Sequence, residues 1–264
     1  MSYIKMRTLL FSLTFILLSF NSFSQKKELY YNEKYQRIEK KVFQEKLKSE
    51  LFRVTSYEND TAKVSKLRYL SFFGTLDSIK NKQLHERLSK LYDLEPTEAW
   101  FMHYIPSLPT PSKMPDEDGI IHIDVKAGDS IFVPRKGRKR RAAKNFDQKK
   151  YSQKRHVFTL ESYQESLTTW SNKWRSKVTF FHIYGKDNGF PTNFSDEVLL
   201  LKDPKNIIRR MFNDGLVPYR VIILHPNGDF FVSGSDLWIP QSKAINYDSY
   251  LREKRKWLKR ISTK

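Results

Sequence analysis

Side chains able to do chemistry are few and scattered in this sequence. Four of its six histidines fall on or beside apolar segments that we expect to be strands: His103, His122, His182 and His225. Imidazoles are the commonest metal ligands in proteins, so this group raises the question of a metal site. None of the four has ligand spacing, such as H-x-H or H-x-x-x-H on one helix. We therefore predict histidines of the core and its rim, with no metal and no cofactor.

Other common catalytic and metal-binding classes lack their residues. The segment PDEDG at 115–119 has three close carboxylates but not the remaining pattern of a calcium loop, so we interpret it as a solvated acidic turn. The chain contains no Cys, which excludes thiol redox chemistry, a thiolate nucleophile and a Cys-ligated metal. We therefore predict no catalytic residues.

The strongest signal is electrostatic. The chain carries a formal net charge of +19, which favours polyanions and acidic surfaces as partners. A basic segment within RKGRKRRAAKNFDQKK, residues 135–150, concentrates this charge. The seven cations from Arg135 to Lys144, which we predict as the binding residues, are Arg135, Lys136, Arg138, Lys139, Arg140, Arg141 and Lys144.

The basic segment predicts a polyanion-binding site, because guanidinium groups suit bidentate contact with phosphate or sulfate. The alternative is a solvated, flexible loop without a partner, since adjacent like charges repel each other. Proteins that bind single-stranded nucleic acid interleave such charges with aromatic side chains, but only Phe146 and Tyr151 lie nearby. Sequence-specific nucleic-acid recognition is therefore not expected.

The first residues have the pattern of an export signal. Lys5 and Arg7 precede an uncharged, mostly apolar run from Thr8 to Phe20, and the small residues Ser22 and Ser24 follow. This predicts a signal peptide at 1–24, with a retained anchor helix as the alternative. We expect an exported protein, periplasmic or extracellular, without a transmembrane span after signal removal. The partners to consider are then an anionic glycan, lipopolysaccharide or an acidic protein.

Hydrophobic periodicity divides the remaining chain into helices and strands. Residues 25–77 predict an N-terminal α+β extension: a strand and turn, a helix, and a hairpin of strands 51–57 and 61–72. The next elements are a helix capped at Asp77 or Ser78 and a buried strand at 99–105. A proline-rich loop then leads into a small hairpin at 119–134. The elements after the basic segment are a helix at 160–177, a buried strand at 177–185, a short strand at 197–203, a short helix at 203–214, a hairpin at 218–234 and a helix at 247–261.

This order of elements resembles the thioredoxin fold, and locally the periplasmic TlpA-like thioredoxins. The matching features are Asp203-Pro204, the helix that reaches Phe212, Val217-Pro218, and a hairpin that turns at Asn227-Gly228. The resemblance covers residues 78–261. It implies an α/β fold for residues 78–264, with a thioredoxin-like mixed sheet flanked by helices. It also implies that Pro218 corresponds to the family's cis-proline.

The resemblance also shows where this chain departs from the family. The Cys-x-x-Cys motif would follow the strand at 99–105, but here an insertion at 106–158 contains the basic segment. An alternative register, with the strand at 177–185 before the motif, leaves too few residues for the following helix.

Three functions are compatible with this interpretation. The first is an exported, non-catalytic thioredoxin-like protein that binds an anionic surface or a protein partner through the basic segment. The second is an envelope hydrolase or other enzyme that uses His and carboxylate side chains near Pro218. In the third, the basic amphipathic helix at 247–261 docks on a partner or a membrane surface, although its apolar stripe also suits ordinary core packing.

Processing at the amino terminus tests the export signal. We expect intact-mass measurement of the protein recovered outside the cytoplasm to give a chain that begins at Gln25. Ile16→Lys should block processing, because a charge interrupts the apolar run that the export machinery recognises. Recovery of the wild-type chain with residues 1–24 still attached would favour the anchor helix instead.

Overall fold

A computed structural model describes residues 26–95, 97–124, 127–135, 153–212, 220–234 and 238–262, without the side chains of 238–241. The signal peptide predicted at 1–24 lies outside these residues. The chain divides into two compact units, Met1–Tyr69 and Leu70–Lys264. Among the described helices, none combines the length and the apolar character needed to cross a membrane.

The first unit is a small sheet with one helix. Its strands have the order β2-β1-β4-β3, with β1 parallel to β4 and the other neighbours antiparallel. The elements are β1 Lys27–Tyr31, β2 Arg37–Ile38, α2 Lys40–Leu47, β3 Phe52–Glu58 and β4 Ala62–Tyr69. Phe43 of α2 is buried and contacts the Tyr30 ring at 4.9 Å. Strands and a helix are thus present in this region, as predicted for 25–77, but the strand at 71–75 belongs to the second unit.

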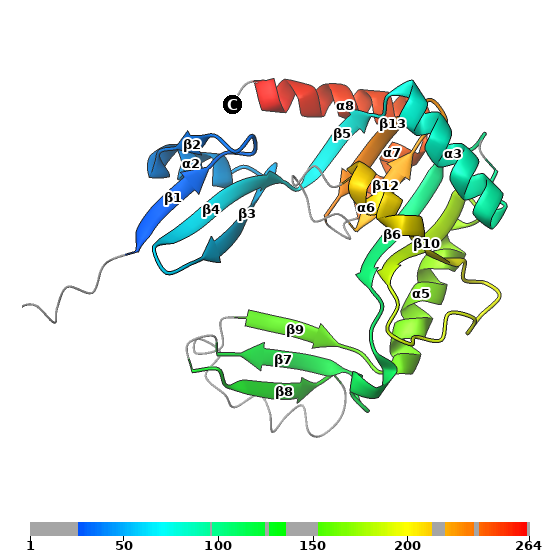
Figure 1. The fold of residues 1–264 in the computed structure, drawn as a ribbon, viewed down its shortest axis with the longest axis horizontal. Helices are drawn as coiled ribbons and strands as arrows, with labels where there is room; N and C mark the ends of the chain where they lie inside the picture. Colours follow the sequence, from blue (N-terminus) through cyan, green and yellow to red (C-terminus); the bar gives the residue numbers. More distant parts are fainter. Residues whose placement is uncertain are drawn as a thin grey trace, which may run out of the picture. The chain divides into compact units, whose positions relative to one another are not determined.

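A six-stranded mixed sheet forms the centre of the second unit (Figure 1). Its order is β11-β10-β6-β12-β13-β5, in which β11, β10 and β6 are parallel and each further strand is antiparallel to its neighbour. The strands are β5 Ser71–Thr75, β6 Trp100–Ser107, β10 Thr179–Lys186, β11 Leu200–Lys202, β12 Val221–Leu224 and β13 Asp229–Ser233. The predicted buried strands are thus the two neighbours β6 and β10.

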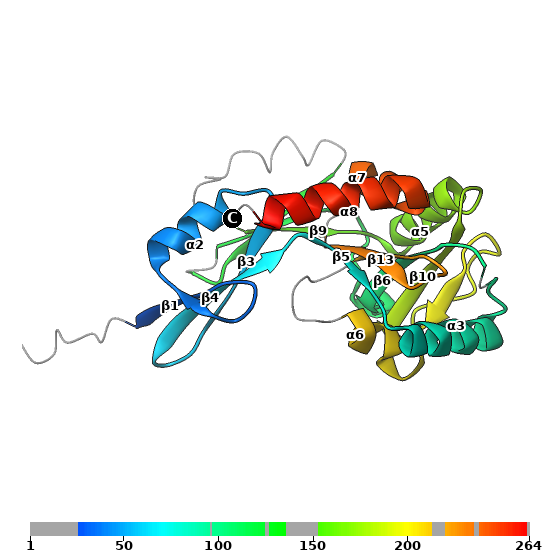
Figure 2. The same ribbon diagram turned by 90° about the horizontal axis from the view of Figure 1, so that it is seen from above.

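Helices cover both faces of this sheet (Figure 2). One face carries α3 Ser78–Tyr92 and α6 Ile207–Phe212, which follows the 3-10 turn η2 Pro204–Asn206; the other carries α5 Leu160–Trp174, α7 Trp238–Ile245 and α8 Tyr247–Ser262. Successive side chains of a strand point to opposite faces. Trp100 and Met102 of β6 accordingly pack with Leu84 and Ile208, whereas Phe101 contacts Trp174 of α5 at 4.8 Å. The predicted α/β class, a mixed sheet flanked by helices, is confirmed.

The sequence signals for helix α3 are confirmed only in part. Asp77 caps the helix, because its Oδ1 accepts a hydrogen bond from the Lys80 amide at 2.9 Å. The spacing of Ile79, Leu84, Leu88 and Leu91 predicts one apolar stripe along this helix. Leu84 and Leu88 are buried accordingly, but Ile79 is 68% exposed and Leu91 is 51% exposed. The stripe therefore packs only through the middle of the helix.

Strand pairing differs from the prediction at residues 61–72. The sequence predicts one strand there, but the chain breaks at Leu70: β4 belongs to the first unit and β5 pairs with β13 of the second. Partners far away in the sequence determine this division, so local patterning does not reveal it.

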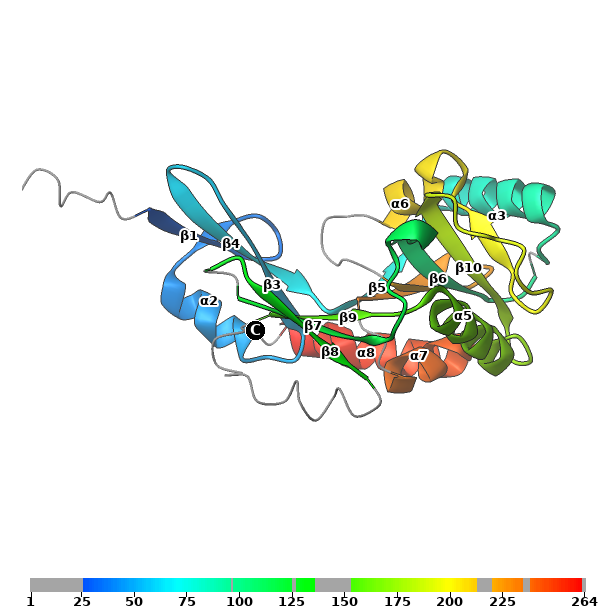
Figure 3. The same ribbon diagram turned by 90° about the horizontal axis from the view of Figure 1, so that it is seen from below.

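The insertion at 106–158 is more than a loop. Its first two residues extend β6, the 3-10 turn η1 Pro111–Lys113 follows, and the three-stranded sheet β8-β7-β9 comes next (Figure 3). The predicted hairpin is confirmed as β7 Gly119–Ile123 and β8 Ser130–Pro134. We did not predict β9, Gln153–Val157, which pairs with β7 and leads into α5. Its Lys154 and Arg155 continue the charge pattern of the basic segment, so the sequence lacks the apolar alternation that would predict a strand here.

The C-terminal helix α8 uses much of its apolar stripe for core packing. Tyr250 is fully buried and Trp257 is 7% exposed, whereas Leu258 on the same helix is 47% exposed. The Tyr250 hydroxyl lies 3.0 Å from the carbonyl oxygen of Gly74 and 3.1 Å from that of Phe230. Tyr250 thus joins α8 to the edge of the sheet.

Removing this hydroxyl tests the role of α8. We expect Tyr250→Phe to lower the free energy of unfolding by about 1–3 kcal/mol, because buried carbonyl groups lose their hydrogen-bond donor. Leu258→Ala is the matched control on the exposed side of the same helix, and it should change stability by less than about 0.5 kcal/mol. Urea unfolding measures both variants, and equal effects would contradict the packing described here.

Candidate functional site

Two histidines form a hydrogen-bonded pair inside the second unit. His103 of β6 and His182 of β10 are register partners on adjacent parallel strands, and their Nδ1 atoms are 2.8 Å apart. His182 is fully buried, whereas His103 is partly exposed. The His103 ring also stacks on Trp170 of α5, with ring centroids 4.7 Å apart. The prediction of scattered histidines is therefore wrong for these two.

The other nitrogen of His182 determines the direction of this hydrogen bond. His182 Nε2 lies 3.1 Å from the Leu167 carbonyl oxygen, which can only accept, so Nε2 carries the proton. The Ser171 hydroxyl lies 3.2 Å from the same nitrogen. In a neutral His182 ring, Nδ1 is then an acceptor. His103 Nδ1 must therefore donate.

Both imidazoles are neutral at physiological pH. Burial, together with the nearby His182 and the positive charge of Arg220, lowers the pKa of His103 to about 3. Burial also lowers the pKa of His182 to about 4, although its hydrogen bond to Leu167 partly offsets this. A neutral pair of this kind shares one proton between the two Nδ1 atoms without carrying a net charge.

His103 lies in the wall of a cavity of about 870 Å³, called here the cationic cavity. The cavity lies between β6, β9, one side of α5 and Arg220, the residue before β12. Three basic side chains line it: Lys154, Arg155 and Arg220. Among the described residues that line it, none is acidic. The remaining lining residues are His103, Tyr104, Ile105, Pro106, His156, Phe158, Tyr163, Ser166, Leu167 and Trp170.

The acidic turn holds one end of this cavity in place. Asp118 accepts hydrogen bonds from the Thr159 amide and the Ser162 hydroxyl, both at 2.7 Å, at the start of α5. Burial alone would raise the pKa of Asp118, but these hydrogen bonds outweigh it and lower the pKa below its usual value. Asp116 and Glu117 are exposed, as expected for a solvated turn. The prediction of a solvated turn is wrong for Asp118, because its carboxylate is hydrogen-bonded to the start of α5.

A second cavity, of about 660 Å³, lies beside the first and has the opposite charge. The two cavities share Phe158, Ser166 and Trp170. The acidic residues that line the second one are Asp116, Glu117, Asp118 and Glu165. Anionic and cationic groups are thus separated around Trp170.

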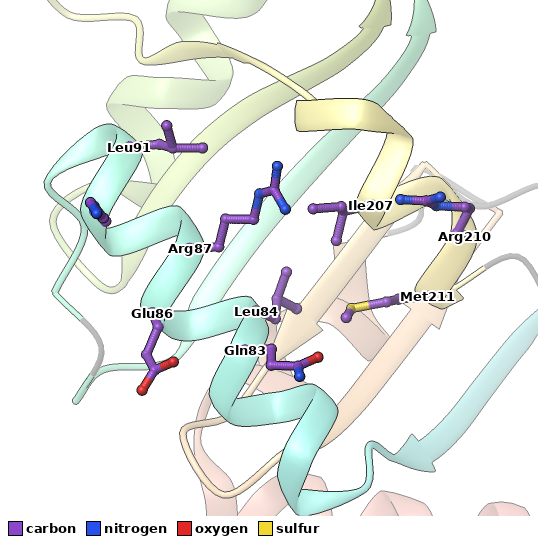
Figure 4. A pocket seen from close by; sticks show the side chains of 9 residues that line it. Gln83, Leu84, Glu86, Arg87, Leu91, Ile207, Arg210 and Met211 are labelled. Carbon is purple, nitrogen blue, oxygen red and sulfur yellow. The ribbon is translucent and has the colours of Figure 1, made fainter.

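A groove between α3 and α6 has a volume of about 700 Å³. In Figure 4 the side chains of Leu84 and Met211 face each other across it. Both belong to the hydrophobic packing beneath, so the floor of the groove is an extension of the core. Arg87, Lys90 and Arg210 line the groove, with Glu86 beside them. It has no buried polar group comparable to the histidine pair.

Most predicted site residues lie outside the described residues. They are Lys136, Arg138, Lys139, Arg140, Arg141, Lys144 and the predicted cis-proline, Pro218. Arg135 is described: its side chain is exposed, its amide donates to the Asp118 carbonyl at 2.8 Å, and it lines the second cavity, together with the carboxylates. Lys154 and Arg155, which continue the basic segment, line the cationic cavity instead.

The histidine pair was the part of the site that sequence reasoning missed. The available signal was that each histidine is the fourth residue of its buried strand. The two strands pair in register from Thr179 with Trp100 onward, which places His182 opposite His103. The other two predicted histidines are buried separately, and His225 Nε2 lies 2.9 Å from the Ala244 carbonyl oxygen. Within the described parts of the chain, no three histidine or carboxylate side chains converge to hold a metal ion.

Comparisons with known proteins add no relative. No family model, no curated protein and no solved structure matches this chain.

The lowered pKa values predict an acid-sensitive fold. The unfolded chain takes up protons on these histidines below about pH 6.5, whereas the folded chain does so only near pH 4 and pH 3. The stabilisation is therefore complete above pH 6.5 and is lost as the pH falls. We expect the free energy of unfolding to fall by up to about 1.4 kcal/mol per pH unit for each histidine.

Proton NMR gives the direct measurement. The ring signals of His103 and His182 should not titrate between about pH 7.5 and 5.5, because both rings stay neutral in the folded chain. Titration of either ring above about pH 6 would contradict the lowered pKa values.

Proposed function

We propose that residues 78–261 form a degenerate thioredoxin-like scaffold. The order of elements supports this assignment: β6, α5 and β10 make a parallel crossover unit, a short helix follows, and the β12–β13 hairpin and α8 complete the chain. The position of β6 in the centre of the sheet also supports it, with β10 on one side and β12 on the other. Without Cys, such a scaffold has no thiol redox activity.

On this scaffold we infer a non-catalytic binding protein for an anionic group, exported to the periplasm or beyond. The observation that carries the proposal is the cationic cavity, lined by Lys154, Arg155 and Arg220 and by no described carboxylate. It adjoins the end of β6 and the start of α5, where the resemblance expects the redox motif. Basic side chains around an aromatic-lined hollow suit the anionic group of a glycan, lipopolysaccharide or acidic protein.

The charge of the basic segment adds to this site. Lys154 and Arg155 belong to β9, which follows the segment directly in the sequence. Attraction of a polyanion to these charges should weaken with salt, because charges are screened beyond about 10 Å at 0.1 M.

The enzyme alternative has less support. A general base is most effective when its pKa lies near the working pH, whereas the pKa of His103 is lowered to about 3. Burial raises the pKa of Tyr163, in the same cavity, to about 12. Neither group is suited to transfer a proton at neutral pH. Binding is consequently the function that these groups favour.

Retention on heparin tests the proposed function. We expect Lys154→Glu/Arg155→Glu to elute at a clearly lower salt concentration than the wild type, because two attractive charges at the cavity become repulsive. Arg252→Glu/Arg255→Glu, two exposed residues of α8, is the control with the same change in net charge, and its elution should shift less.

Alanine substitution of the cations from Arg135 to Arg141 measures how much the basic segment contributes to heparin retention, apart from Lys154 and Arg155. Reduced retention in both this variant and the β9 variant would support one continuous binding surface. If the β9 variant and its α8 control elute together, net charge alone explains retention and the cavity has no role.

A further inference from the structure

We propose that the Nε2 atom of His103 is a permanent hydrogen-bond acceptor in the cationic cavity and selects anions that still carry a proton. Hydrogen phosphate, which keeps an O–H group at neutral pH, should bind in preference to sulfate, which has none. This inference rests on the proposed function, because it names the chemical class of the anionic group that the cavity binds.

A relay of hydrogen bonds holds His103 in this state. The Leu167 carbonyl accepts from His182 Nε2, at 3.1 Å, and His182 Nδ1 accepts from His103 Nδ1, at 2.8 Å. Since His103 donates from Nδ1, its Nε2 keeps a lone pair. An unprotonated His182 Nε2 would place its lone pair against the Leu167 carbonyl oxygen at 3.1 Å, so the relay takes this direction while both rings are neutral, and the Ser171 hydroxyl beside Nε2 acts as a second acceptor. Stacking on Trp170 further restricts the ring of His103.

The environment keeps this acceptor from becoming a donor. Arg220 and His182 disfavour a positive charge on His103, in addition to the effect of burial. Arg220 immediately precedes Val221, the strand partner of His103, and its charge partly offsets the rise that burial causes in the pKa of Tyr163. The basic side chains therefore surround a nitrogen that stays unprotonated.

The rest of the cavity offers mainly donors to an anion. Lysine and arginine side chains donate and do not accept, and the hydroxyls of Tyr163 and Ser166 can rotate to donate. His156 is exposed and can change its tautomer. His103 Nε2 is thus the acceptor whose state a buried network determines.

Sulfate and hydrogen phosphate separate the two contributions. Both are compact oxyanions that basic side chains attract, but sulfate presents only acceptor oxygens to Nε2. Hydrogen phosphate can turn its O–H toward Nε2 and complete a hydrogen bond. A lone pair that faces an acceptor oxygen remains unpaired, and this cost falls on sulfate alone.

Calorimetric titration of the mature chain with sodium phosphate and sodium sulfate at pH 7.5 tests the inference. We expect phosphate to bind about tenfold more tightly than sulfate, the effect of one hydrogen bond to a charged ligand. His103→Ala should abolish this preference, whereas His156→Ala, in the same cavity, should retain it. Equal affinities for the two anions in the wild type would overturn the inference.

The result also distinguishes this inference from the proposed function. If both anions bind equally and Lys154→Glu/Arg155→Glu weakens both, the cavity binds anions and only the role of His103 fails. If neither anion binds and heparin retention does not depend on Lys154 and Arg155, both proposals fail.

A measurement on the wild type avoids dependence on a variant that fails to fold. Nitrogen-15 NMR of the imidazoles should show an unprotonated Nε2 in His103 and an unprotonated Nδ1 in His182. A protonated Nε2 in neutral His103 would overturn the inference.

Phosphate esters identify the source of the phosphate group. At pH 6 roughly half of a phosphomonoester carries a proton, whereas a diester carries none. Binding of glycerol phosphate but not of dimethyl phosphate supports a terminal phosphomonoester as the ligand. Binding of inorganic phosphate alone supports the free ion, and tighter binding of the diester than of the monoester would contradict selection by His103.

Discussion

The hydrogen bond between His103 and His182 is the interaction on which the second unit's candidate site depends. It joins the two central parallel strands, and its continuation to the Leu167 carbonyl connects the sheet to helix α5. A buried polar atom without a partner costs about 1–3 kcal/mol, so this network tolerates few alternative arrangements. This network is thus one of the contacts that position α5, together with Asp118 at its start and the packing of Trp174 on Phe101.

Electrostatics in the second unit are organised around this neutral pair. Basic groups line one side of Trp170 and carboxylates line the other, while the histidines between the strands carry no charge. A charged imidazole in this position would be both desolvated and close to Arg220, which is why the pKa of His103 is lowered. In the proposed binding site, the basic side chains would attract an anion while His103 presents an unprotonated nitrogen to it. Attraction and selectivity would then come from different residues.

The insertion supplies half of the site. Its strand β9 brings Lys154 and Arg155 to the cavity, and its acidic turn binds the first turn of α5 through Asp118. In a thioredoxin-like scaffold without cysteines, such an insertion would replace a reactive pair by a binding surface. Such a site would bind a partner through hydrogen bonds and charged side chains, and it would have no reactive thiol.

Local sequence patterns determined much of this protein. The apolar runs at β6 and β10, the capped helix α3, and the amphipathic helices α5 and α8 could be predicted, because each depends on residues close in the chain. Only the tertiary structure decided that 61–72 divides between two sheets, that β9 is a strand, and that His103 meets His182. Strand register and partner choice arise from contacts between distant segments, which no local period contains. The sequence contains the residues of the cavity, but only the pairing of distant strands brings them together in one site.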